Sequence, residues 1–202
     1  MKGIIGLTGG IGTGKTEVAR LFAILGARIY PADEASKYLL DHNSELKQKL
    51  INAFGSELYQ NSEINRKAFA AIIFGDSNSL TLANSIIHPF VFADFEAWVK
   101  KQPEYSYSIM EAAILFESKM NERMEKIICI YSPLELRISR VMKRDSCARE
   151  EVLKRMRNQI TDEEKIKRAD FVIINDDEHM LIPQVLEIHQ QLIANSLNYR
   201  LI

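Results

Sequence analysis

The chain has 202 residues, of which 47% are hydrophobic and 26% charged, with a formal net charge of −1. This length fits one domain with a smaller insertion. The balanced charge and the absence of a basic tail exclude nucleic-acid binding driven by a broad basic surface, so any phosphate affinity must come from a local site.

Two further features bear on the compartment. Cys129 and Cys147 are isolated thiols without metal-ligand spacing, which favours a reducing environment over a disulfide framework. No uncharged stretch is long enough to cross a bilayer, and the apolar run at the N-terminus is too short for a signal peptide. We therefore expect a cytoplasmic protein without membrane or nucleic-acid partners.

The first elements alternate between strand and helix. Residues 3–7 form an apolar run typical of a strand buried on both faces, and glycines follow it at once. Residues 15–25 have helical apolar spacing, and Gly26 is expected to end that helix. Residues 27–30 predict a second strand, which Pro31 should interrupt because proline has no N–H to donate.

The segment 33–93 is predicted to be mostly helical and is the candidate second subdomain. Helix is then expected to resume through Trp98 and to end before Pro103. Breaks are expected where turn-forming residues or proline occur, near Asn43, Gly55, Asn61–Ser62, Gly75–Asp76 and His88–Pro89.

The remaining chain returns to alternation. Strands are predicted at 106–110, 126–131 and 171–174, and helices at 133–143, through the charged stretch 144–167 and near the C-terminus. Strands separated by helices predict an α/β protein with a doubly wound parallel sheet of about five strands.

One motif is complete. Gly9-Gly10-Ile11-Gly12-Thr13-Gly14-Lys15-Thr16 fits G-x-x-x-x-G-K-[ST], and it lies between a predicted strand and a predicted helix. Glycines allow positive φ and bring successive N–H groups onto phosphate oxygens, while the helix N-terminus adds its dipole. Lys15 is expected to reach the β- and γ-phosphates and the Thr16 hydroxyl to ligate Mg²⁺. The motif predicts nucleotide binding.

The class of nucleotide-binding protein is narrowed by what the chain lacks. The N-K-x-D motif of GTPases is absent, and the chain is too short for the accessory domains of most large ATPases. A small fold with a helical insertion and an arginine-rich helical segment favours a small-molecule kinase, in which arginines close over the transferred phosphoryl group.

Several linked motifs resemble the dephospho-coenzyme A kinase family over about residues 3–175. The resemblance rests on the phosphate loop with its flanks and on segments that keep the family's order: Gly6–Thr16, Ala32-Asp33, Asn65-Arg66-Lys67, Phe74, Asp76, Ile87-His88-Pro89, Leu115-Phe116-Glu117, Arg140 to Asp145, Gln159, Arg168 to Ile173, and Asn175. It implies a P-loop kinase with a helical acceptor-binding insertion at about 34–100 and a lid at about 140–167.

The chain departs from the family pattern at a few positions. Pro31 stands for the first Asp of an Asp-Ala-Asp motif, Glu111 for a strand-end Asp, and Ala113 for a proline. Arg137 replaces a polar residue that is often Gln, and Glu17 follows Thr16 where a small hydroxyl residue is commoner. These departures bear on Mg²⁺ ligation and on orientation of the acceptor.

The resemblance also implies roles for single residues. Asp33 would orient the acceptor hydroxyl and take its proton; the alternative is the N-cap of the next helix, and the two roles can coexist. Arg140 and Arg144, one helical turn apart, would bind phosphate oxygens; the alternative is a solvated face paired with Glu135 or Asp145.

The other candidate site residues carry weaker signals. Glu111 is a candidate for helping Thr16 hold Mg²⁺, or simply a surface residue at a strand end. Arg66 and His88 are candidates for acceptor binding; the alternatives are a surface salt bridge and a buried structural corner. The full expected ATP site comprises Gly10, Ile11, Gly12, Thr13, Gly14, Lys15, Thr16, Glu17, Arg144 and Asn175.

The resemblance implies phosphorylation of the ribose 3′-hydroxyl of dephospho-coenzyme A by ATP and Mg²⁺, the last step of coenzyme A biosynthesis. Two alternatives remain: a nucleoside or nucleoside-monophosphate kinase, and a catalytically weak ATP-binding homologue with a regulatory role, which Pro31 and Glu111 would favour.

Overall fold

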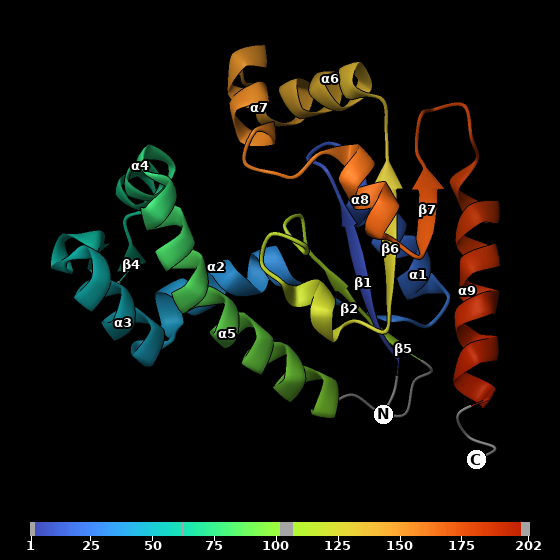
Figure 1. Ribbon diagram of the computed structural model, residues 1–202, viewed down its shortest axis with the longest axis horizontal. Coiled ribbons are helices and arrows are strands. Elements are labelled where there is room, and N and C mark those ends of the chain that lie inside the picture. The colour runs from blue at the N-terminus through green and yellow to red at the C-terminus, as the bar shows by residue number, and fades with distance from the viewer. Residues whose placement is uncertain (1–2, 62, 102–106, 199–202) are drawn as a thin grey trace. The chain divides into compact units, whose positions relative to one another are not determined.

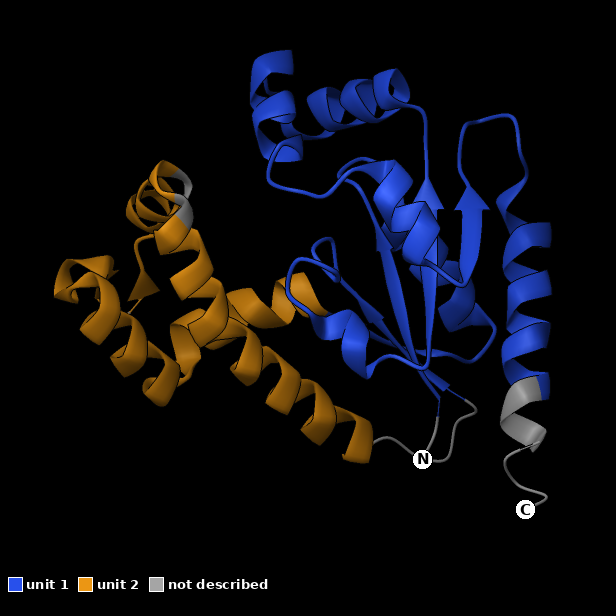
Figure 2. Ribbon diagram, in the orientation of Figure 1, with its two compact units in different colours: residues 1–31, 102–202 blue, residues 32–101 orange. Residues whose placement is uncertain are grey.

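A computed structural model describes residues 3–61, 63–101 and 107–198 (Figure 1). The chain divides into two compact units, one formed by residues 1–31 and 102–202 and the other by residues 32–101 (Figure 2). Ser62, Pro103 and Ser106, which entered the predictions above, lie outside the described residues, as does the side chain of Phe74.

The first unit contains a parallel sheet of five strands in the order β2-β5-β1-β6-β7. These strands are β1 (Gly3–Gly9), β2 (Arg28–Pro31), β5 (Tyr107–Glu111), β6 (Lys126–Tyr131) and β7 (Phe171–Ile174). The predicted fold class, an α/β protein with about five parallel strands, is confirmed. In such a sheet the loops at the carboxyl ends of the strands share one edge, where ligands bind.

Pro31 corrects one expectation. It does not interrupt β2 but is its last residue, in register with Glu111 of β5. Because β2 is at the edge of the sheet, a residue without an N–H is tolerated there.

Both faces of the sheet are covered (Figure 1). Helices α1 (Lys15–Ile24) and α9 (Leu181–Asn198) contact each other on one face and share a core with the strands. The buried members of that core include Leu7, Val18, Phe22, Ile109, Ile128, Ile173 and Val185. On the other face, α8 (Asp162–Arg168) contacts β6, and Leu115 approaches Gly6 of β1 closely.

The charged stretch 144–167 is not one helix, as predicted, but parts of three. Helix α6 (Leu134–Asp145) ends at Ser146, whose φ of 51° is incompatible with continuing a right-handed helix. Helix α7 (Arg149–Met156) follows, and α8 begins after Thr161, whose side chain accepts a hydrogen bond from the Glu164 N–H. The charge pattern of residues 144–167 did not predict the helix end at Ser146 or the helix start at Thr161.

The second unit is built mainly from helices. Its elements are α2 (Ala32–His42), α3 (Ser44–Phe54), the 3₁₀ helix η1 (Ser56–Leu58), β3 (Tyr59–Gln60), β4 (Glu63–Ile64), α4 (Arg66–Gly75) and α5 (Ser77–Lys101). Helix α5 contacts α2, α3 and α4. The strands β3 and β4 pair antiparallel in a hairpin that was not predicted, because two residues a strand carry no periodic signal.

The predicted breaks in this unit have mixed outcomes. Asn43 caps α3 by accepting from the Leu46 N–H, and Gly55 ends that helix with a φ of 96°, so these two breaks are confirmed. The break between α4 and α5 at Gly75–Asp76 is confirmed as well. The break at His88–Pro89 is wrong, because α5 continues through Pro89 while packing on three neighbouring helices.

Candidate active site

The phosphate loop joins β1 to α1 through glycines that the geometry requires. Gly12 and Gly14 have φ values of 83° and 87°, which side-chain-bearing residues rarely adopt. A Cβ on Gly12 would also lie 2.6 Å from the Arg137 carbonyl oxygen, and one on Gly14 would lie 2.4 Å from Nδ2 of Asn175. The loop is therefore enclosed by other segments, and its shape depends on both glycines.

Side chains of the loop stabilise it from within. The buried Thr13 hydroxyl donates a hydrogen bond of 2.9 Å to the Gly10 carbonyl oxygen. The Lys15 ammonium donates to the carbonyl oxygens of Gly9, at 3.0 Å, and Gly10, at 3.3 Å. Lys15 thus lies over the loop, next to the N–H groups at the start of α1, where an anion is favoured.

Thr16 and Glu111 lie together, as the sequence suggested. The Thr16 hydroxyl donates to Oε1 of Glu111 over 3.2 Å, since α1 begins beside the carboxyl end of β5. A hydroxyl and a carboxylate are hard oxygen ligands, which suit Mg²⁺ held by few protein groups and by substrate phosphates. Among the described residues no group of three or more acidic, His or Cys side chains is placed to hold a metal ion.

Asn175, at the end of β7, links the loop to the lid helix α6. Its side-chain amide donates to the Thr13 carbonyl oxygen at 2.8 Å. Arg140 donates to the Asn175 carbonyl oxygen at 3.2 Å and to the Ser132 hydroxyl at 3.1 Å, and it forms an ion pair with Asp177. The alternative that paired Arg140 with Glu135 or Asp145 is wrong, because those carboxylates have other partners.

Those other partners are on the outer part of the lid. Arg144 and Arg155 both pair with Asp145, at 2.7 and 2.6 Å, and they lower the pKa of that carboxyl to about 2. Arg149 forms a two-pronged pair with Glu135, with both distances at 2.7 Å. For Arg144 the predicted surface pair with Asp145 is confirmed, and its role in ATP binding stays a prediction.

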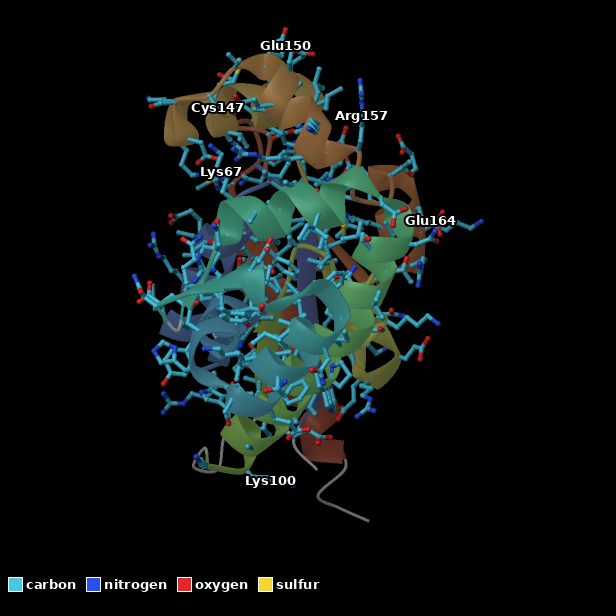
Figure 3. The ribbon with its side chains drawn as sticks, turned by 90° about the vertical axis from the view of Figure 1, so that its left-hand side faces the viewer. Lys67, Lys100, Cys147, Glu150, Arg157 and Glu164 are labelled. Atoms are coloured by element: carbon cyan, nitrogen blue, oxygen red, sulfur yellow. The ribbon has the colours of Figure 1, made fainter. Side chains whose placement is uncertain are left out.

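This outer part is solvated. Glu150 and Arg157 are exposed, and Figure 3 shows them with Cys147 at the end of the first unit that α6 and α7 form. Ion pairs in such a setting are weak, at about 0–1 kcal/mol each. Glu17, another predicted ATP contact, is also at the surface and pairs with Arg20 one turn along α1.

Two residues that hold the loop were missed as site residues. The Arg137 side chain, 4% exposed, donates from Nε to the Ile11 carbonyl oxygen at 2.9 Å. Gln159 accepts from the Ile11 N–H at 2.9 Å. A signal existed for Arg137, because it occupies a core-facing position of α6 with the buried Ile138 and Val141. For Gln159 the only signal was its place in the family resemblance.

The remaining predicted residues belong to the second unit. Asp33 is exposed and is the second residue of α2, so it lies inside the first helical turn rather than at the N-cap position. Arg66 forms an ion pair with Asp41. His88 is partly buried within α5, and desolvation lowers its pKa to about 4, which favours the neutral ring. Helix α5 is continuous at His88, so the expected structural corner is not formed.

Comparisons with known proteins agree with this geometry. A family model described as dephospho-CoA kinase matches residues 3–180. A dephospho-CoA kinase of Bacteroides fragilis strain YCH46 is 39% identical over 184 residues, which cover 91% of this chain and 90% of the relative.

Two solved structures have the same fold over nearly the whole chain. The crystal structure of TT1252 from Thermus thermophilus is 30% identical with a TM-score of 0.83, over 94% of this chain and 97% of that one. Dephospho-CoA kinase from Campylobacter jejuni is 27% identical with a TM-score of 0.68, over 96% and 99%. With a complete phosphate loop on a five-stranded parallel sheet, and a family match over most of its length, this chain is a kinase that belongs to the dephospho-CoA kinase family.

Proposed function

We propose that the protein transfers the γ-phosphoryl group of ATP to the ribose 3′-hydroxyl of dephospho-coenzyme A, giving coenzyme A and ADP. The observation that carries this proposal is the gathering of Lys15, Thr16, Glu111 and Arg140 around one phosphate loop, in a chain of this family. The reaction would be the last step of coenzyme A biosynthesis.

On the ATP side, the loop amides and the N-terminus of α1 would bind the phosphates, and Lys15 would exchange its carbonyl partners for β- and γ-phosphate oxygens. Thr16 and Glu111 would hold Mg²⁺, which supplies charge neutralisation when bound. Arg140 would stabilise charge on the transferred group through its planar fork of donors. Loop residues 10–14, Glu17, Arg144 and Asn175 complete the proposed ATP site.

On the acceptor side, the Asp33 carboxylate would take the proton of the 3′-hydroxyl. The oxygen then forms its bond to the γ-phosphorus while the bond to the bridging oxygen of ADP breaks. Asp33 follows β2 by two residues, and the last residue of β2 is in register with Glu111, so the chain leaves the sheet at its carboxyl edge.

The helical unit, about residues 34–100, is proposed to bind the acceptor, and α6 to α8, about residues 140–167, to form the lid. Arg66 would exchange the Asp41 carboxylate for an acceptor phosphate, which presents similar oxygens. His88, held neutral by burial, would offer one donor and one acceptor rather than a charge.

We further propose that the protein works in the cytoplasm, because the described chain keeps Cys129 and Cys147 as free thiols. Separately, no described helix has both the length and the apolar character needed to cross a bilayer.

The acceptor is tested by measuring ATP consumption with a panel of alcohols and phosphates, with the product identified by mass spectrometry. We expect dephospho-coenzyme A to be preferred by at least about tenfold in kcat/KM, equivalent to about 1.4 kcal/mol. Preference for a nucleoside or its monophosphate would replace the proposal with the second kinase class. ATP binding without turnover of any acceptor would indicate the regulatory homologue.

The role of Asp33 is tested with Asp33→Asn. We expect kcat with dephospho-coenzyme A to fall by roughly 10²-fold, the usual scale for a lost general base, while ATP affinity is unchanged. Glu34→Gln is the matched control, because Glu34 is an exposed acidic neighbour in the same helical turn. An Asp33→Asn enzyme as active as this control would remove Asp33 from the mechanism.

A further inference from the structure

A buried ion pair lies outside the groups used so far. Lys165 of α8 is fully buried, and its Nζ is 3.7 Å from Oε1 of Glu117, whose side chain is 16% exposed. Nζ makes no hydrogen bond within the described part of the chain. Burial lowers the pKa of Lys165, while the Glu117 carboxylate opposes that shift.

Such a pair contributes little to stability. Removing two charges from water costs more than a loose contact returns, and well-packed apolar side chains often serve as well or better. The pair is therefore better explained by what it positions than by folding free energy.

Glu117 is connected to the phosphate loop through Ile160 and Gln159. Its Oε1, the atom nearest Lys165, also accepts a hydrogen bond of 2.9 Å from the Ile160 N–H. The preceding residue, Gln159, accepts from the Ile11 N–H at 2.9 Å and donates to the Ala113 carbonyl oxygen at 3.1 Å. Gln159 therefore bridges the phosphate loop and the segment that follows β5.

A second connection starts from the same helix. Asp162, the first residue of α8, forms an ion pair with Arg137, whose Nε donates to the Ile11 carbonyl oxygen. Both polar groups of Ile11 are thus held by side chains that depend on the position of α8. A loop that binds phosphate through its backbone needs this fixed geometry, since misplacement of its amides weakens every contact with the ligand.

We propose that Lys165 and Glu117 are positioning residues for the nucleotide, acting on the loop through Gln159. The Lys165 ammonium fixes the Glu117 carboxylate, the carboxylate fixes the Ile160 peptide, and this peptide sets where Gln159 meets Ile11. The inference rests on the proposed use of the loop for ATP, but it does not depend on which acceptor is phosphorylated.

The test is a double-variant cycle read out by calorimetric binding of MgADP, with the free energy of unfolding measured in parallel. Gln159→Met, which leaves the Ile11 N–H without its side-chain acceptor, should weaken MgADP binding about tenfold. Lys165→Met should weaken it about three- to tenfold. The double variant should bind MgADP about as well as Gln159→Met alone, because Lys165 then has nothing left to position.

Stability provides the contrast. The changes that the two substitutions make in the free energy of unfolding should add in the double variant. Coupling in MgADP affinity without coupling in the free energy of unfolding would distinguish a positioning role from a purely structural one. Lys167→Met is the matched control, because Lys167 is an exposed lysine of the same helix. It should leave the MgADP affinity unchanged.

Three results would overturn the proposal: Lys165→Met binding MgADP like the wild type, the two affinity losses multiplying in the double variant, or Lys167→Met having an equal effect. If Lys165→Met does not fold, Glu117→Gln replaces it in the same cycle with the same expectations. A wild-type protein that binds MgADP but leaves dephospho-coenzyme A unchanged would refute the proposed acceptor only, whereas failure to bind MgADP would refute both proposals.

Discussion

The phosphate loop and the helical unit of residues 32–101 use polar side chains in opposite ways. The loop is held by partners far along the chain: Asn175 reaches Thr13 across 162 residues, and Gln159 reaches Ile11 across 148. In the helical unit many polar side chains form hydrogen bonds with backbone groups only a few residues away. Asn43, Asn65 and Asp76 each accept from an N–H three residues ahead.

The difference concerns what each hydrogen bond maintains. A local cap stabilises one helix terminus and nothing beyond it, at about 1 kcal/mol. The distant contacts fix the position of a loop that has little regular structure of its own, so they determine ligand geometry. We therefore expect substitutions around the loop to alter nucleotide binding and turnover, and those in the helical unit's caps and core to alter the free energy of unfolding.

The largest expected effect is that of Lys15→Ala. No other loop side chain can bring a mobile positive charge to the β- and γ-phosphates, so kcat/KM for ATP should fall by roughly 10²- to 10³-fold. Steady-state kinetics measure this, with Arg20→Ala as a control at an exposed basic residue of the same helix. Retention of more than about a tenth of the activity would contradict the role given to Lys15.

A smaller effect is expected from Arg140→Lys, which tests the boundary between the loop and the lid. The guanidinium contacts Ser132 and Asn175 through one nitrogen and Asp177 through another, and a compact ammonium cannot reproduce this planar fork on two phosphate oxygens. Turnover should fall about tenfold or more and resemble Arg140→Ala. Lys143→Ala, at an exposed position of α6, should be nearly silent. A lysine variant with wild-type kinetics would make Arg140 a surface charge.

In the helical unit, His88 should affect stability through pH. Its pKa is about 4 in the folded protein and 6.5 for an unperturbed histidine, so between these values the unfolded chain binds more protons. The free energy of unfolding should therefore fall as pH drops from 6.5 to 4. This loss should be smaller for His88→Gln, by about 2 kcal/mol. Denaturant titrations at both pH values measure the difference.

The smallest effect belongs to Asn43→Ala, which also serves as the control for pH. Loss of the cap on Leu46 should lower the free energy of unfolding by about 1 kcal/mol at either pH, with turnover per folded molecule unchanged. If this variant instead changed the KM for ATP, the contrast between the loop and the helical unit would not hold.

Much of the fold was predictable because its signals are local. Apolar runs located all five strands of the sheet, and Asn43 and Gly55 marked a helix start and stop through their own chemistry. The hairpin of β3 and β4 is too short to show a period. The continuity of α5 through Pro89 depends on packing against three other helices, and tertiary contacts of that kind are not visible in a short sequence window.

The same distinction between local signals and long-range contacts applies to the residues of the site. The motif located Lys15 and Thr16, and the end of a predicted strand located Glu111, which the structure places beside Thr16. The supports of the loop were missed, because the partnership of Arg137 or Gln159 with Ile11 requires the folded chain. The roles of Asp33, Arg66 and His88 stay predictions.

The resting position of Lys15 has a consequence for selectivity among anions. Its ammonium already has two carbonyl acceptors in Gly9 and Gly10, so an incoming ligand must compete with them rather than meet a bare charge. A single small anion such as chloride gains little from that exchange. A polyphosphate gains more, since it offers several oxygens to the lysine and to the loop amides at once. The carbonyl groups of Gly9 and Gly10 thus compete with the anion for Lys15, so only an anion that makes several contacts binds the loop tightly.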